Sequence, residues 1–79
     1  MKVASVRKVR RLLRKVGFRK SPKGNATGHE VWSDALGRRC LPVMRRKEIH
    51  IGQLYCLAHQ LETNGVLSRT EFFDLLQSI

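Results

Sequence analysis

The sequence has few acidic residues, few cysteines and no long hydrophobic run. Only 6 residues are Asp or Glu, against 16 Lys and Arg, which gives a formal net charge of +10. No apolar stretch approaches the roughly 20 residues of a membrane-spanning helix, and the N-terminal segment lacks the apolar core of a secretory signal. We therefore expect a cytoplasmic protein that does not associate with membranes.

The two cysteines, Cys40 and Cys56, do not have the close spacing of metal ligands. In a chain with no secretion signal we expect both to be reduced and structural. The sequence therefore predicts no metal site and no cofactor.

A chain of 79 residues is expected to form one domain, residues 1–79, with one modest core and only a shallow binding site. Its charge is unevenly distributed, because every acidic residue lies at Glu30 or later and ten of the basic residues lie between Lys2 and Lys23. Such a field attracts nucleic acid, an acidic protein or an anionic membrane. A basic face that only maintains solubility is the alternative.

Apolar residues recur at three- and four-residue intervals near the N-terminus, which predicts a helix from Ala4 to Val16 with a basic opposite face. Gly17 suits the end of that helix. A second apolar stripe from Ile51 to Leu61 predicts another helix, which ends at Asn64 and Gly65. A third helix is predicted over residues 68–78, because Ser68 and Glu71 have the spacing of a capping box.

Three strands are predicted between the first two helices, at Phe18–Ser21, His29–Ser33 and Arg38–Val43. The first is expected to be an edge strand. Residues 34–37 are expected to form the turn that joins the other two strands as a hairpin. Pro42 has no N–H, so its strand should be an edge or should lack a ladder bond there. The order predicts an α+β fold similar to a double-stranded-RNA-binding domain, α-β-β-β-α with an additional C-terminal helix.

His29 follows a glycine-containing loop and begins the second predicted strand. RNA can be cleaved when its own 2′-hydroxyl attacks the adjacent phosphate, which requires proton transfer and stabilisation of negative charge. Histidine titrates near neutral pH and can transfer that proton. An ordinary surface histidine is the competing interpretation for His29, and we expect His50 and His59 to be partly exposed structural residues.

Several basic residues are candidates for contacts with RNA phosphates. They are Lys20, Lys23, Arg38, Arg39, Arg45, Arg46 and Lys47. A solvated loop is the alternative for the last three. Trp32, with Tyr55 or Phe18, could stack on a base, but core packing is the favoured role for so few aromatic residues.

The ordered set of motifs resembles the HicA-type mRNA interferase toxins of bacterial toxin–antitoxin modules. The similarity spans Val9 to Leu61, and its parts are Leu12–Lys20, Gly28–Trp32, Gly37–Arg39 with Pro42 and Val43, and Lys47–Ile49 with Gly52. That resemblance implies a metal-independent endoribonuclease with His29 as its one catalytic histidine, and a HicB-type antitoxin that covers it. Where the family commonly has glycine, a small polar residue and then histidine, this chain has Thr27, Gly28 and His29.

Non-catalytic binding is the main alternative function. The second predicted helix, the break at Asn64 and Gly65, and the last predicted helix follow one another in the order of a DNA-binding helix-turn-helix unit. The last helix opposes this interpretation, because it carries Arg69 against Glu71 and Asp74, whereas a helix in the major groove should be neutral or basic. A non-catalytic RNA-binding module or a ribosome-associated structural protein would also explain the positive charge.

Overall fold

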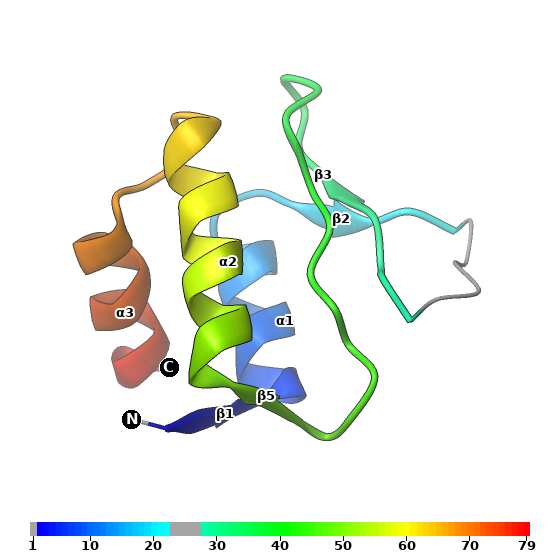
Figure 1. The fold of residues 1–79 in the computed structure, drawn as a ribbon. Coiled ribbons are helices and arrows are strands. Elements are labelled where there is room, and N and C mark those ends of the chain that lie inside the picture. Colours follow the sequence, from blue (N-terminus) through cyan, green and yellow to red (C-terminus); the bar gives the residue numbers. More distant parts are fainter. Residues whose placement is uncertain (1, 23–27) are drawn as a thin grey trace.

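A computed structural model describes residues 2–22 and 28–79, which form an α+β fold (Figure 1). The helices in these ranges are α1 (Val6–Lys15), α2 (Ile51–Thr63) and α3 (Arg69–Ser78). The strands are β1 (Val3–Ser5), β2 (Arg19–Lys20), β3 (Trp32–Ser33), β4 (Arg39–Cys40) and β5 (Glu48–His50). None of the helices in these ranges has the length and apolarity that crossing a bilayer requires.

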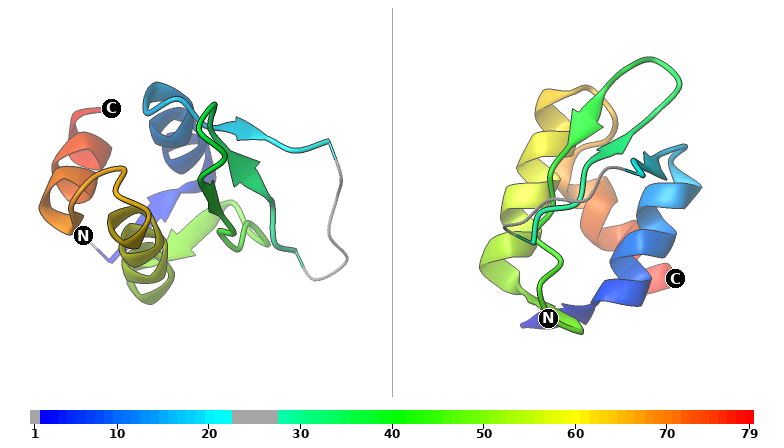
Figure 2. Two further views of the ribbon diagram at one scale, coloured as in Figure 1. Left: turned by 90° about the horizontal axis from the view of Figure 1, so that it is seen from above. Right: turned by 90° about the vertical axis from the view of Figure 1, so that its right-hand side faces the viewer.

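The described strands form two small antiparallel sheets, one of β1 and β5 and one in the order β2-β3-β4. The three helices lie together on one side of the molecule, and the three-stranded sheet lies on the other (Figures 1 and 2). Residues 41–48 lead from the hairpin down to β5, below the start of α1 (Figure 1). This segment connects the two sheets.

Helix α1 begins two residues later than the sequence predicts. Ser5 caps it, because its hydroxyl accepts a hydrogen bond from the Lys8 N–H at 3.2 Å. The predicted apolar stripe is confirmed as buried at Val6, Val9 and Leu13, with Leu12 at its margin, whereas Val3 is exposed and Val16 is half-buried. Residues 3–5 form strand β1 instead of the first helical turn.

The β1–β5 sheet was not predicted at all. Ala4 pairs with Ile49, and both side chains are buried. The Val6 N–H donates to the Lys47 carbonyl at 2.8 Å, so the pairing reaches the start of α1. Because the two strands are short and far apart in sequence, neither has a local pattern that could reveal its partner.

The central hairpin forms with the predicted turn, but its regular strands are shorter than expected. Trp32 pairs with Cys40, and the same register continues as a single bridge between His29 and Val43. Pro42 lies between these pairs, two residues beyond the edge strand β4, and has no N–H for the ladder. Its carbonyl still accepts a hydrogen bond from the Glu30 N–H at 3.1 Å.

Side chains from α2 bind the outer edge of the hairpin. Gln60 accepts a hydrogen bond from the Leu41 N–H at 2.8 Å, and Asn64 donates to the Arg39 carbonyl at 2.6 Å. These bonds satisfy backbone groups of the edge strand that would otherwise face water or another chain. The hairpin is therefore held against α2 as well as against β2.

The predicted third helix and its capping box are confirmed. The Ser68 hydroxyl accepts from the Glu71 N–H at 3.1 Å, and the Glu71 carboxylate accepts from the Ser68 N–H at 2.9 Å. Phe72 and Leu76 are the fully buried residues of this helix. They close the side of the core that α1 and α2 leave open.

Trp32 and Phe18 are both completely buried in the core, so packing is their role, as favoured from the sequence. Cys40 is also buried, and burial raises the pKa of its thiol to about 12. Cys56 is exposed on α2, so the expectation of a structural role there is wrong. Both cysteines are free thiols.

Candidate nucleic-acid interface

The antiparallel register assigns the residues of the hairpin to two faces of the sheet. Trp32 and Glu30 lie on the face toward the helices, and Trp32 is buried there. His29 therefore lies on the opposite face together with Val31 and Ser33. It is half-buried, and its backbone is held by the pair with Val43.

Glu30 connects three elements immediately next to His29. Its carboxylate accepts a hydrogen bond from Arg10 of α1 at 2.7 Å and one from the Trp32 indole N–H at 3.0 Å, and Lys20 of β2 lies 3.4 Å away. Only 12% of the Glu30 side chain is exposed. Burial raises the pKa of Glu30, but the hydrogen bonds from Arg10 and Trp32 and the two positive charges outweigh it, so the pKa lies below its ordinary value.

Gly28, which directly precedes His29, occupies a position that disfavours any residue with a side chain. Its φ of +85° is unfavourable for other residues, and an added Cβ would collide with Cγ of Arg45. The Met44 N–H donates to the Gly28 carbonyl at 3.0 Å. Arg45 is therefore held beside the residue that precedes His29, although it lies far from it in sequence.

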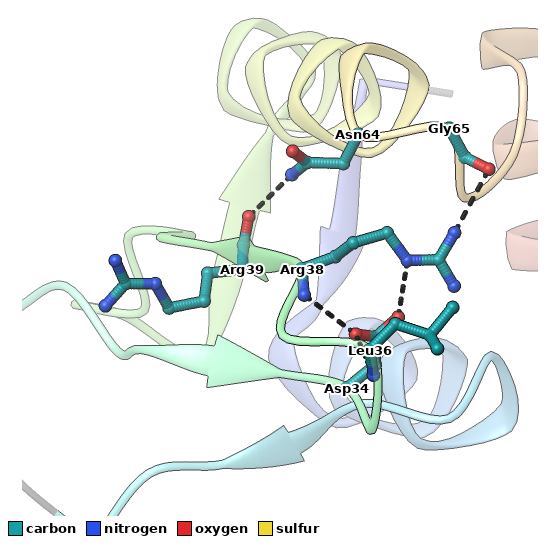
Figure 3. A network of polar contacts seen from close by, with 6 residues as sticks. All are labelled: Asp34, Leu36, Arg38, Arg39, Asn64 and Gly65. Atoms are coloured by element: carbon teal, nitrogen blue, oxygen red, sulfur yellow. Dashed lines mark hydrogen bonds and ion pairs between the residues drawn. The ribbon is translucent and has the colours of Figure 1, made fainter.

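Arg38, one of the predicted RNA-binding residues, makes internal contacts at the turn of the hairpin (Figure 3). Arg38 forms an ion pair with Asp34 at 2.7 Å and donates to the Gly65 carbonyl at 3.3 Å. Burial raises the pKa of Asp34, but its hydrogen bonds with Arg38 outweigh this effect and lower it. Arg39 is exposed, and its guanidinium points away from this network (Figure 3).

Arg45, Arg46 and Lys47 lie in an exposed loop, as predicted, and they line a groove of about 810 Å³. The start of α1 also lines this groove, with Arg7 and Arg10. The groove is therefore bordered by five cations, with Glu48 as its acidic residue.

The predicted RNA-binding residues are thus only partly brought together. Arg45–Lys47 lie on one groove and Arg39 on the outer face of the hairpin, whereas Lys20 and Arg38 have carboxylate partners within the fold. Lys23 lies outside the described residues. Sequence reasoning did not include Arg7 and Arg10 in the site, although their place on the basic face of α1 was the signal that could have identified them.

The remaining histidines are His50, which ends β5 and lines a second groove with Arg45 and Arg46, and His59 of α2. His50 and His59 are exposed at the start and in the second half of α2. Tyr55 is exposed on the same helix and contacts Phe73 with ring centroids 5.0 Å apart. Within residues 2–22 and 28–79 there is no cluster of three or more metal-ligating side chains.

Comparison with known proteins adds no relative, because no family model, no curated protein and no solved structure matches the chain.

Proposed function

We propose that this protein is a metal-independent endoribonuclease that cleaves mRNA with His29 as its catalytic residue. The observation that carries the proposal is the position of His29 on a hairpin face opposite the core, with Arg45 held against its neighbour Gly28. A proton-transfer group and a cation are thus brought to one place by segments distant in sequence. The proposal includes the expected double-stranded-RNA-binding type of fold, and the hairpin with helices on one side supports that part of it.

In the proposed reaction the RNA 2′-oxygen forms a bond to the adjacent phosphorus, and the bond from phosphorus to the 5′-oxygen breaks. His29 takes the proton of the 2′-hydroxyl, and the leaving 5′-oxygen receives a proton from water. The products are a 2′,3′-cyclic phosphate and a 5′-hydroxyl. Arg45, with Arg46 beside it in the groove, stabilises the additional negative charge on the phosphate oxygens.

The resemblance to HicA-type toxins extends the proposal to a toxin of a toxin–antitoxin module in the cytoplasm. Its partner would be an acidic HicB-type antitoxin that covers His29. The net charge of +10 supports rapid association with an acidic partner, because complementary charge accelerates encounter.

The proposal is tested by incubating the purified protein with single-stranded RNA in excess chelator. We expect fragments that end in a 2′,3′-cyclic phosphate, and we expect His29→Ala to abolish cleavage while the fold and most RNA affinity are retained. Replacing the substrate with its 2′-deoxy analogue should also prevent cleavage, because the attacking hydroxyl is then absent.

His59→Ala is the matched control, since His59 is an exposed histidine on α2, and it should cleave like the wild type. Equal cleavage by the wild type and His29→Ala would show that another group, or a contaminant, is responsible. RNA binding without cleavage by either would favour the non-catalytic binding module.

A further inference from the structure

We propose that helix α1 and the loop of residues 45–47 form a second part of the RNA-binding surface, which binds the phosphates that lie beyond the cleaved position. This inference rests on the proposed function for the identity of the ligand. It extends the site beyond His29 and Arg45 to α1, in which none of the candidate residues named from the sequence lies.

The solvent face of α1 is a continuous basic stripe, which we define as Arg7, Lys8, Arg11, Arg14 and Lys15. All five side chains are exposed. At about 100° per residue they lie within about 120° of the helix circumference, opposite the buried Val9 and Leu13. No acidic residue occurs in α1, so nothing within the helix neutralises the stripe.

The stripe has few internal contacts in the described part of the chain. The acidic partners in the ion pairs there are Glu30, Asp34 and Glu62, and none of them pairs with a stripe residue. The guanidinium of Arg14 lies 5.6 Å from the Trp32 ring centroid, and it is still exposed. Arg14 and Lys15 lie in the last turn, where the helix dipole favours cations, but Arg7 and Lys8 lie in the first turn, where it disfavours them. Like charges three and four residues apart also repel each other, so fold stability gives no reason for the complete stripe.

The stripe is continuous with the groove beside the hairpin. Arg7 belongs to the stripe and also lines the groove together with Arg46 and Lys47. The hydrogen bond from Val6 to Lys47 holds the loop against the start of α1. At the other end of the loop, Arg45 lies against Gly28. A strand with its reacting phosphate at His29 can therefore continue through the groove and along α1.

The length and chemistry of this surface fit a nucleic-acid strand. A helix of 10 residues is about 15 Å long, which is enough to lie beside several successive phosphates of a strand. Protein interfaces need apolar or aromatic anchors at their centre. The exposed large hydrophobic residues of the described chain are Val3, Leu36, Leu41 and Tyr55, and none lies in α1 or in the groove loop.

The test uses the His29→Ala protein, so that binding is measured without cleavage. Arg11→Gln in the stripe and Arg46→Gln in the groove are compared with Arg69→Gln on α3, and each substitution removes one positive charge. Arg69 is a suitable control because it is exposed and its ion pair with Glu62 is at the surface. Affinity for a labelled single-stranded RNA is measured by fluorescence anisotropy over a series of salt concentrations.

We expect Arg11→Gln and Arg46→Gln each to weaken binding several-fold and to reduce the salt-dependence slope by about 0.7, the value for one phosphate contact on a single strand. Arg69→Gln should leave the slope unchanged. If the first two variants behave like Arg69→Gln, the proposed surface does not bind RNA. A polyglutamate arm tests the other class of ligand, and selective loss of polyglutamate binding would assign the stripe to an acidic protein instead.

The outcome is independent of the catalytic proposal. Loss of RNA affinity in Arg11→Gln supports the second surface even if the wild type does not cleave RNA. Conversely, cleavage that depends on His29 would stand even if Arg11 proved irrelevant to binding.

Discussion

Glu30 is the residue through which α1, β2 and β3 are joined beside His29. Its carboxylate is nearly buried, and hydrogen bonds from Arg10 and Trp32 compensate for that burial. Removing the carboxylate leaves the Trp32 N–H and the Arg10 guanidinium without their acceptor. The local shape of the hairpin therefore depends on a residue that need not touch RNA.

We expect Glu30→Ala to lower the free energy of unfolding by about 2 kcal/mol, because hydrogen bonds to a charged group contribute roughly 1.5–3 kcal/mol. Urea denaturation measures the change. Asp74→Ala, which removes an exposed carboxylate on α3, should alter stability by less than about 0.5 kcal/mol. The interpretation would be wrong if both variants were equally stable.

The same comparison should depend on pH. The pKa of Glu30 is lower in the folded protein than its ordinary value of 4.5. Its contribution to stability is therefore fully present above that value and is lost as the pH falls through the folded pKa. The difference between wild type and Glu30→Ala should accordingly shrink in acid, and a difference that stays constant to low pH would contradict the role of the charge.

At the scale of elements, some helices and strands can be predicted from a local sequence pattern and others cannot. Helix α3 belongs to the first kind, because Ser68 and Glu71 form the cap within one turn. The sequence predicted it correctly for that reason. The pairing of β1 with β5 belongs to the second kind, because no local sequence pattern identifies either strand as the partner of the other.

We expect Ser68→Ala to destabilise the protein by about 1 kcal/mol, the usual cost of losing an N-cap. Thermal or urea unfolding measures it. Thr70→Ala at an exposed position in the same turn is the control, and it should cost nothing because alanine is the better helix former. Similar losses in the two variants would show that the cap is not what starts the helix.

The hairpin shows how tertiary contacts change the roles of residues that look alike in sequence. Arg38 and Arg39 are neighbours with the same charge, and both were predicted to bind RNA. Arg38 pairs with Asp34 and reaches the α2–α3 turn, whereas Arg39 is exposed (Figure 3). The alternation of side chains along a strand separates them, but only the position of Asp34 and Gly65 explains the first contact.

At the scale of the whole molecule, positive charge is the dominant feature. Residues before Glu30 include no acid, and the described part of them forms β1, α1 and β2, beside the hairpin and the groove. The positive potential is consequently concentrated over one part of the surface. A polyanion that binds there must release its counterions.

We therefore expect the affinity of the His29→Ala protein for single-stranded RNA to fall steeply as salt increases. Three or more phosphate contacts at about 0.7 each predict a slope of log affinity against log salt steeper than about −2. Fluorescence anisotropy at several salt concentrations measures it. A slope close to zero would show that the basic surface does not contact phosphates.

The sequence by itself determined the α+β class, the three helices, the hairpin turn and the separation of charge, because these follow from periodicity, capping and composition within short segments. Only the tertiary structure decided that β1 pairs with β5, that Glu30 binds Arg10 and Lys20, and that Arg45 lies against Gly28. The physical reason is that these contacts join residues from distant segments. Their geometry exists only after the helices and strands have packed around one core.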